Sequence, residues 1–484
     1  MITEIQNFDP LSASRPSQAR GRHRVLLHSV SPAQDSLRCY FTMTTLHAEG
    51  NFQSLQNALP VLKELGINAL WLSPVHPQTM RNEHYYWPSD HSKVDEAIGG
   101  DKAYCKLVHE ARKRGIEICQ DCVLNHFGYY AQHELAQGGN IRPDTTEAGT
   151  KTLQELFQRL DASGNREEVL EIQQEIAQIS LQGLPSLQHD KKEVQEYLIG
   201  SYKKFVDMGV RFFRLDAAKH VSLAFLKQFI SALQTHGTRC GKRVRFVLEL
   251  LLGNYFAFEV FAGEILNAVP DPEQVFFFDF PQAFELRKVT ECDYQFDWFA
   301  RWLHYREANT HQARHYMPML ENHDFETRFT NTFEAKAAHV MSEFVSWNSV
   351  VLFHGAETTG RMQEPREYLP TINPQGDLGL LLKTVAHALH DYRSSQRFGC
   401  TTIQRADEDG LILEKSLEHK SIFVLINKKY TYEIHGQLVW AEEHVRRTQL
   451  RVVYQENGAA LWADGNRFPY RLPPRSMVFV ELLH

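Results

Sequence analysis

Polar residues follow four apolar runs in this chain of 484 residues, and their types are those that perform acid–base chemistry. The residues in question are Asp121, Asn125, His126, Arg214, Asp216, Lys219, His220, Glu249, Asn322, His323 and Asp324. An ionised carboxylate beside apolar residues costs free energy unless it is paired or used in chemistry. Acidic residues that recur at the ends of apolar strands therefore predict an active site, with purely structural salt bridges as the alternative.

Asp216 and Glu249 differ in their sequence surroundings. Arg214 lies two residues before Asp216, hence on the same face of a strand, where a cation keeps a carboxylate ionised. Glu249 stands between Leu248 and Leu250, with no cation beside it in the sequence, and apolar surroundings favour a protonated carboxyl group. We therefore expect Asp216 to act as nucleophile and Glu249 as general acid/base, a pair that suits glycoside hydrolysis with retention.

A repeated unit predicts the elements that position these residues. An amphipathic helix end, a glycine and an apolar strand recur around Gly66, Gly115 and Gly209. Glycine after a helix adopts the left-handed conformation at low cost, and continuous apolar strands are typical of a parallel sheet covered by helices. Five further strands are expected at 38–43, 244–250, 275–280, 316–320 and 349–354. Eight strands predict an α/β fold, a (β/α)8 TIM barrel over 36–126 and 185–398, with its chemistry at the carboxyl ends of the strands.

The barrel is expected to carry additions. Gly209 lies 94 residues after Gly115, whereas Gly115 lies 49 after Gly66, which predicts an inserted subdomain at 127–184 after strand three. Its apolar stripes indicate a helical hairpin over the barrel mouth, and they comprise Leu153, Leu156, Phe157, Leu160, Val169, Ile172, Ile176 and Ile179. Short β-rich runs and turns predict a C-terminal antiparallel, sandwich-like β domain at 399–484. Residues 1–35 are expected to form an N-terminal extension.

Composition excludes several classes of protein. The net charge of -7 argues against nucleic-acid binding, and no apolar run approaches the roughly 18 residues that span a membrane. Seven cysteines, an odd number, and the lack of an apolar signal core favour the cytoplasm, or export without a classical signal peptide. The pair Cys119 and Cys122 is a weak redox or zinc signal, and burial in a strand is the favoured interpretation.

Four segments of the chain resemble the conserved regions of the α-amylase family of glycoside hydrolases (family 13). They are DCVLNH at 121–126, GVRFFRLDAAKHV at 209–221, VLELLLG at 247–253 and ENHD at 321–324, in the family's order. HYYWPSDHSKVDEAIGG at 84–100 and FHGAE at 353–357 resemble the stretches after its second and eighth strands. The resemblance covers most of residues 36–400.

The resemblance implies a role for each site residue. Asp216 would form the covalent glycosyl intermediate, Glu249 would protonate the leaving oxygen and later activate water, and Asp324 would stabilise the oxocarbenium-like transition state. Asp121 would support the site. The implied substrate-binding set is Tyr86 as a stacking platform, His126 and His323 for glucose hydroxyls, Arg214 to orient Asp216, and Lys219 and His220 on the leaving-group side.

Some positions depart from the family's pattern. Leu248 and Tyr85 replace family glycines, and we expect both larger side chains to narrow the cleft. Asn125 and His220 match positions of a structural calcium site, but Ser186 stands where the family often has a calcium-binding Asp. Binding of a structural calcium ion is therefore doubtful, and no metal ligands are predicted. The chemistry itself needs no cofactor.

The leading hypothesis is endo-hydrolysis of α-1,4-glucosidic bonds in starch, glycogen or maltodextrins, so the expected partner is an α-glucan or maltooligosaccharide. An α-glucanotransferase or an exo-acting α-glucosidase with the same carboxylates is the runner-up. A third hypothesis is a catalytically silent carbohydrate-binding protein. The intact carboxylates of Asp216, Glu249 and Asp324 argue against it. The C-terminal domain is expected to stabilise the barrel, with glucan binding as its alternative. The oligomeric state is left open.

Overall fold

The computed structural model describes residues 37–46, 50–80, 84–142, 147–291, 294–309, 312–324, 332–346, 349–358, 372–389, 401–416, 420–438, 449–464 and 467–483. The expected N-terminal extension at 1–35 lies outside the described residues. Among the described residues, no helix has the length and apolar character needed to cross a membrane.

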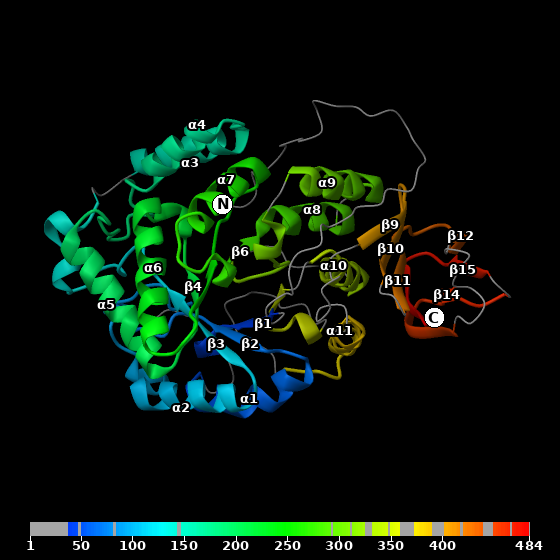
Figure 1. Ribbon diagram of the computed structural model, residues 1–484, viewed down its shortest axis with the longest axis horizontal. Helices are drawn as coiled ribbons and strands as arrows, with labels where there is room; N and C mark the ends of the chain where they lie inside the picture. Colours follow the sequence, from blue (N-terminus) through cyan, green and yellow to red (C-terminus); the bar gives the residue numbers. More distant parts are fainter. Residues whose placement is uncertain are drawn as a thin grey trace.

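Eight strands form one parallel sheet in the order β7-β6-β5-β4-β3-β2-β1-β8. Their bounds are β1 Leu37–Thr42, β2 Ala69–Leu72, β3 Glu117–Cys122, β4 Phe212–Leu215, β5 Arg245–Leu248, β6 Val275–Asp279, β7 Tyr316–Pro318 and β8 Ser349–Phe353. A parallel bridge between Met319 and Val351 joins the two ends of this order into a barrel. The predicted (β/α)8 fold is confirmed (Figure 1).

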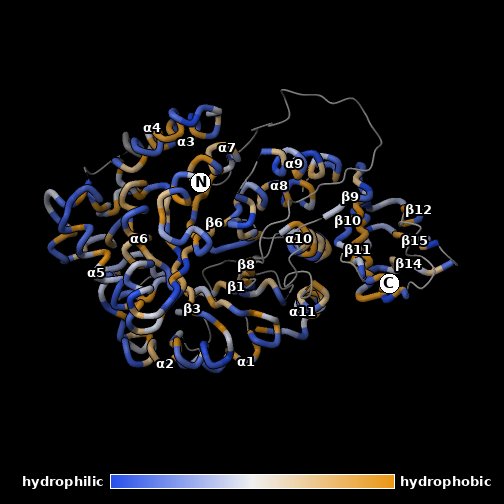
Figure 2. Tube along the Cα trace, viewed as in Figure 1, coloured by the Kyte–Doolittle hydropathy of each residue, from blue (hydrophilic) through white to orange (hydrophobic). Residues whose placement is uncertain are grey.

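Helices connect the strands and cover the outside of the barrel (Figure 1). They are α1 Phe52–Glu64, α2 Gly100–Lys113, α5 Lys192–Met208, α6 Leu223–Arg239, α7 Tyr255–Leu266, α8 Phe280–Glu291, α9 Phe296–Asn309, α10 Thr332–Val345 and α11 Asp377–Ala388. The three marker glycines have positive φ angles, 76° at Gly66, 67° at Gly115 and 108° at Gly209, as predicted. Figure 2 shows hydrophilic and hydrophobic residues alternating along these helices, as expected where one helix face meets the core.

The strands bury both of their faces in two separate apolar cores. Side chains at alternate positions, such as Trp71, Cys119 and Val247, fill the inside of the barrel. Their neighbours, such as Leu70 and Leu248, pack outward against the helices. Because side chains alternate along a strand, any residue two positions beyond an inward one also points to the barrel axis.

The insert after β3 contains the expected helical hairpin. It comprises the short helices η3 Glu134–Ala136 and η4 Gly138–Asn140, then α3 Glu147–Ala162 and α4 Arg166–Ile176. Asn165 caps α4, accepting hydrogen bonds from the backbone N–H groups of Glu167 and Glu168. The hairpin lies against α7 and against η5 Ala218–His220, which directly follows β4 (Figure 1). It therefore covers the carboxyl ends of β4 and β5.

The C-terminal strands form two antiparallel sheets, as predicted. One has the order β13-β16-β11-β10-β9 and the other β12-β15-β14. Their bounds are β9 Thr401–Ala406, β10 Gly410–Ser416, β11 Lys420–Asn427, β12 Ile434–Leu438, β13 Gln449–Glu456, β14 Ala460–Leu461, β15 Phe468–Leu472 and β16 Ser476–Leu483. One face of the larger sheet packs on the smaller sheet through Phe423 and Val480, and its other face packs on the barrel, where Phe479 meets Phe344 of α10. This arrangement supports a stabilising role for the domain.

The Cys119–Cys122 pair cannot cooperate in redox or metal chemistry. The two residues are three apart on β3 and belong to different cores, Cys119 inside the barrel and Cys122 outside it. Both are fully buried, and burial raises the pKa of each thiol well above its usual value. The favoured interpretation of these cysteines as packing residues is therefore confirmed.

Candidate active site

Alternation along the strands brings acidic side chains to the axis of the barrel. Asp121 is two residues beyond the inward Cys119, and Glu249 is two beyond the inward Val247. Arg214 and Asp216 continue the inward positions of Phe212 on β4. Backbone hydrogen bonds fix the last positions: Asp216 N donates to Cys122 O at 3.0 Å, and Glu249 N donates to Leu215 O at 3.1 Å. Asp216 and Glu249 thus lie at strand ends whose backbone is fixed by hydrogen bonds.

One guanidinium group links three of these carboxylates. The Nη1 atom of Arg214 lies 2.9 Å from Asp121 Oδ1 and 2.5 Å from Asp216 Oδ1, and its Nη2 atom lies 2.8 Å from Glu249 Oε2. The side chain of Arg214 is 1% exposed. Glu249 has no cation beside it in the sequence, but the barrel places Arg214 between both catalytic candidates, so the apolar surroundings inferred for Glu249 are wrong. Two carboxylates on the two arms of one guanidinium favour the short separation, about 5–5.5 Å, that is typical of retaining enzymes.

The concentration of acids changes their protonation. Burial raises the pKa of Asp216 well above its usual value; Arg214 opposes this effect and Glu249 adds to it. Burial likewise raises the pKa of Asp121, again against the effect of Arg214. A single guanidinium cannot fully compensate this many carboxylates, so neighbouring acids disfavour one another's ionised forms. The site can therefore hold both a carboxylate and a carboxylic acid, as two-step glycoside chemistry requires.

Tyr86 and His323 form a stacked pair beside the carboxylates. Their rings lie 4.9 Å apart at an interplanar angle of 8°, and the Tyr86 hydroxyl donates to Asp121 Oδ2 at 2.7 Å. Burial lowers the pKa of His323 to about 3, so its ring is neutral, and its Nδ1 atom is buried with no hydrogen-bond partner among the described residues. Asp324, beside it, is 41% exposed in its side chain. This side of the site thus offers an aromatic surface, an unused ring nitrogen and a solvent-facing carboxylate.

The other predicted ligands are more enclosed than the sequence suggested. His126 is 3% exposed, and its Nε2 atom is 3.0 Å from Tyr86 O while its Nδ1 atom is 3.3 Å from Asn125 Nδ2. Both ring nitrogens therefore hold protein groups, which suits a role in fixing Tyr86. His220 is also 3% exposed, and its ring meets Phe157 of the insert edge-on at 5.8 Å.

Lys219 faces the insert as well. Its Nζ atom donates to Leu251 O at 3.0 Å and lies 4.2 Å from the centre of the Phe157 ring. Burial lowers the pKa of Lys219 to about 8. The predicted leaving-group side of the cleft is therefore built partly by α3, through a residue that the sequence marked only as a packing position.

Tyr85 and Leu248 do not narrow the cleft, contrary to the expectation from the sequence. Tyr85 has a φ angle of 64°, which turns its side chain into the outer core, where it is 5% exposed and its hydroxyl donates to Asp95 Oδ2 at 2.9 Å. Leu248 is fully buried in the same outer core, because it alternates with the inward Glu249. Both replacements of glycine thus point away from the carboxylates.

Two contributors to the site had no clear signal in the sequence. Trp71 lies inside the barrel, and its indole N–H donates to Asp121 Oδ2 at 2.9 Å. Ala217 adopts a left-handed conformation with a φ angle of 44°, and its N–H donates to Glu249 Oε2 at 2.7 Å. Because side chains alternate along each strand, the inward direction of Trp71 on β2, near Asp121 on β3, could have been predicted from the sequence. A non-glycine residue in this strained conformation cannot be read from a sequence.

Asn125 and Ser186, two of the positions compared with a calcium site, are hydrogen-bonded to other protein groups. Asn125 Oδ1 accepts a hydrogen bond from Arg142 Nη1 at 3.0 Å, so a positive charge already occupies its coordination direction. Ser186 Oγ is 3.1 Å from the donating Leu181 N and itself donates to Leu184 O at 3.2 Å. In the described part of the chain, the only group of three or more His, Cys, Asp or Glu ligand atoms within 4.8 Å of one another is Asp207, His236 and Cys240. These lie at the ends of α5 and α6, where β4 and β5 begin, and so at the opposite end of the barrel.

Comparison with known proteins agrees with this architecture. The family model described as "Alpha amylase, catalytic domain" matches residues 37–237, which include Asp121, Arg214 and Asp216. Residues 37–237 of the chain therefore match the α-amylase family of glycoside hydrolases. The match ends before Glu249 and Asp324, and the ion pair with Arg214 brings Glu249 beside the matched residues.

Proteins with several different names are similar to this chain. Neopullulanase 2 of Thermoactinomyces vulgaris is 29% identical over 182 residues, which cover 37% of this chain and 29% of the relative. A cyclomaltodextrin glucanotransferase of Bacillus sp. (strain 1-1) is 24% identical over 400 residues, which cover 76% of this chain and 52% of the relative. The chain thus spans at most about half the length of these curated relatives. The α-amylase of Geobacillus thermoleovorans, solved with acarbose, has the same fold with a TM-score of 0.72 at 18% identity, covering 93% of this chain and 98% of that structure.

Proposed function

We propose that this protein is a retaining glycoside hydrolase that cleaves α-1,4-glucosidic bonds of starch, glycogen or maltodextrins. The observation that carries the proposal is the convergence of Asp216 and Glu249 on one guanidinium at the carboxyl end of a TM barrel. The names of the relatives, which include amylase, neopullulanase and cyclomaltodextrin glucanotransferase, support an α-glucan as substrate.

Each step of the proposed reaction has a residue placed for it. Asp216 attacks the anomeric carbon while Glu249 donates a proton to the leaving glycosidic oxygen, which forms a covalent glycosyl ester. Glu249, now ionised, removes a proton from water, and this water attacks the anomeric carbon and releases Asp216. The Ala217 N–H and Arg214 Nη2 lie 2.7 and 2.8 Å from Glu249 Oε2 and so hold this carboxyl group in place.

The remaining residues would bind and polarise the sugar. The face of Tyr86, held by His126 and Asp121, offers an apolar surface for the C–H face of a glucose ring. The unpartnered Nδ1 of His323 and the exposed carboxylate of Asp324 would bind ring hydroxyls. Asp324 would also stabilise positive charge on the oxocarbenium-like transition state.

The decisive experiment is the product profile on soluble starch, glycogen and maltoheptaose. We expect short maltooligosaccharides released as α-anomers, detected by NMR during the first turnovers. Asp216→Asn and Glu249→Gln should each lower turnover by at least about 10⁴-fold, whereas Asp207→Asn, an exposed carboxylate at the far end of the barrel, should retain activity. Release of β-anomers, or activity that survives Asp216→Asn, would refute the proposed mechanism.

A second candidate is transfer of the glycosyl group to another sugar. Cyclomaltodextrin glucanotransferases match up to 80% of this chain, which favours this alternative over others. The covalent intermediate and its residues would be the same, and an acceptor hydroxyl would replace water. Products longer than maltoheptaose, or cyclic products, would assign the protein to this activity.

A further inference from the structure

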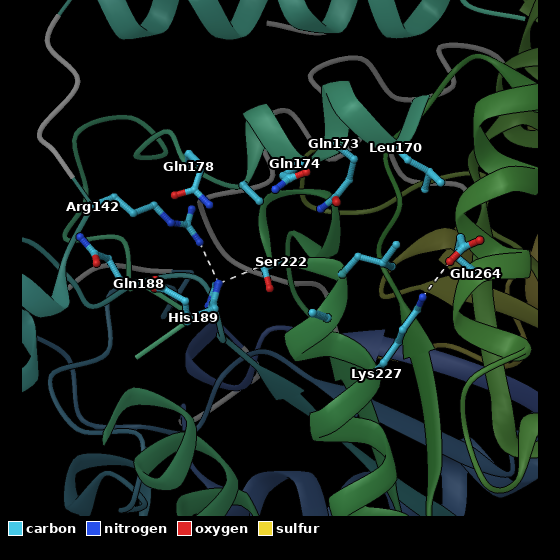
Figure 3. A pocket seen from close by; sticks show the side chains of 14 residues that line it. Arg142, Leu170, Gln173, Gln174, Gln178, Gln188, His189, Ser222, Lys227 and Glu264 are labelled. Carbon is cyan, nitrogen blue, oxygen red and sulfur yellow. Dashed lines mark hydrogen bonds and ion pairs between the residues drawn. The ribbon is translucent and has the colours of Figure 1, made fainter. Parts of the chain in front are cut away.

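Arg142 lies at the junction between the insert and the barrel. Arg142 follows η4 in the insert and is 2% exposed. Its backbone N–H donates to Ser186 O at 2.7 Å. Figure 3 shows its side chain at one wall of a pocket of about 520 Å³, with His189 and Ser222 beside it. This pocket lies between α4 and α6 and includes none of the candidate catalytic residues.

The guanidinium group of Arg142 is held by acceptors from three separate segments. Its Nη1 atom donates to Asn125 Oδ1 at 3.0 Å, after β3, and to Ile179 O at 3.3 Å, after α4. Its Nη2 atom is 2.9 Å from His189 Nδ1, before α5. One side chain thus joins both ends of the insert to two loops of the barrel.

All three acceptors are uncharged. His189 Nε2 lies 3.0 Å from Leu124 O, which requires a proton on Nε2 and leaves Nδ1 free to accept from Arg142. Burial lowers the pKa of His189 to about 3, so the ring is neutral at ordinary pH. Burial also lowers the pKa of Arg142, to about 10, against the opposing effect of the nearby Asp190 carboxylate, and the guanidinium is still charged at neutral pH.

A buried positive charge surrounded by an amide oxygen, a main-chain carbonyl and an imidazole nitrogen has the surroundings of a bound cation. We propose that Arg142 is a covalently attached cation that takes the place of a structural metal ion at this junction and fixes the insert over the cleft. The charge reaches its cage as part of the chain, so folding of the insert requires no metal.

The same group also connects to the site. Asn125, which accepts from Arg142, contacts His126, and His126 contacts the backbone of Tyr86. Arg142 is therefore a positioning residue, separated from the sugar platform by two side chains. Its loss should affect substrate binding more than the chemical step.

Thermal unfolding in the presence and absence of metal tests the proposal directly. The midpoint of unfolding of the unmodified protein should shift by no more than about 1 °C on addition of EDTA or of millimolar calcium chloride, because the cage holds no exchangeable ion. Elemental analysis of the purified protein should find calcium well below one atom per chain. A stoichiometric calcium content, or a midpoint that falls with EDTA and recovers with calcium, would overturn the proposal.

Three variants separate charge from packing. Arg142→Met keeps the length of the side chain without its charge, and should lower the midpoint by several degrees and expose the insert to limited proteolysis. Arg142→Lys, which restores the charge with fewer donors, should recover part of this loss. Arg159→Met, on α3 of the same insert, removes an exposed arginine 3.7 Å from Glu175 and should change neither property.

Steady-state kinetics on maltoheptaose complete the test. We expect Arg142→Met to raise KM about 5- to 10-fold while kcat changes less than about 2-fold, and Arg142→Lys to restore KM in part. If Arg142→Met had the stability, protease resistance and KM of the parent, Arg142 would have no anchoring role. The metal and stability measurements do not depend on glucan turnover, so they test this proposal even if the proposed activity is wrong.

Discussion

Two buried arginines, Arg214 and Arg142, organise this protein by opposite means. Arg214 is in contact with the carboxylates of Asp121, Asp216 and Glu249, and these charges contribute to raising its pKa well above its usual value. Arg142 is held by neutral groups, and burial lowers its pKa to about 10. The first guanidinium compensates an excess of negative charge, and the second is bound by uncharged acceptors, with the carboxylate of Asp190 as its charged neighbour.

The difference shows what each region can tolerate. In the cleft, the charges are coupled, so a change at one acid alters the protonation of the others. At the junction, the three acceptors of Arg142 are uncharged, so the arrangement holds segments together and offers no carboxylate for acid–base chemistry among these contacts. We therefore expect chemistry to depend on the environment of Arg214, and attachment of the insert to depend on that of Arg142.

The largest expected effect is that of Arg214→Met. Removing this cation leaves buried carboxylates uncompensated, and breaking a buried ion pair on one side costs about 3–5 kcal/mol of unfolding free energy. Activity should fall by at least about 10³-fold, because Asp216 and Glu249 lose the group that orients them. Arg142→Met should cost only about 1–3 kcal/mol, since it leaves neutral acceptors unpaired.

Urea unfolding and kcat/KM on maltoheptaose measure both effects. The two methionine variants are matched in size and in the charge removed. Equal losses of stability, together with retained turnover in Arg214→Met, would mean that the two guanidinium groups do not differ in function.

Acidification should distinguish the two regions next. Burial lowers the pKa of His189, at the junction, from 6.5 to about 3, whereas burial raises the pKa of Asp121, in the cleft, above its usual value. The stability contributed by neutral His189 is complete above pH 6.5 and is lost as the pH falls toward 3, because the unfolded chain binds the proton first. Asp121 has the opposite sign, since the folded protein binds its proton at higher pH than the unfolded chain does.

Comparing His189→Gln with the parent protein isolates the contribution of His189 to the pH dependence of stability. One proton changes the unfolding free energy by at most about 1.4 kcal/mol per pH unit. Urea unfolding at pH 7.5, 6.0 and 5.0 should therefore show a shallower loss of stability on acidification in His189→Gln. An identical pH dependence in both proteins would show that His189 is not a buried neutral group.

The features that the sequence could predict are those set by alternation and by chain direction. The glycines at 66, 115 and 209 located the helix–strand junctions, and residues two apart on a strand share a face, so Arg214 and Asp216 had to lie together. The carboxyl ends of parallel strands meet at one end of a barrel, which brought Glu249 near them.

Other features depend on contacts between distant segments. Arg142 stands in a polar stretch, and its partners Asn125, Ile179 and His189 are 17 to 47 residues away, so no local pattern marks it. The direction of Tyr85 depends on a left-handed backbone, which residue type alone does not reveal. The sharing of Arg214 between Asp216 and Glu249 similarly needed the spacing of β4 and β5.

The smallest expected effect concerns Asn254, which attaches the insert without any charge. This fully buried residue follows β5, and its Nδ2 atom donates to Leu160 O, Asp161 O and Ser163 O at 3.1, 2.9 and 2.9 Å, at the turn of the hairpin. Its Oδ1 atom accepts from Ala257 N at 3.1 Å and caps α7. Asn254→Ser keeps a capping oxygen but is too short to reach the carbonyls, so it should cost about 1 kcal/mol.

Asn254→Ala serves as the control, because it also removes the cap and should cost about 1 kcal/mol more. Both variants are measured by urea unfolding beside Arg142→Met. Loss of the Asn254 amide leaves three backbone carbonyl groups of the hairpin turn without this donor, whereas loss of Arg142 removes a buried charge together with the donors that hold three separate segments. If Asn254→Ser were as destabilising as Arg142→Met, the charge of the arginine would be irrelevant to attachment, and any set of hydrogen bonds from the barrel would hold the insert equally well.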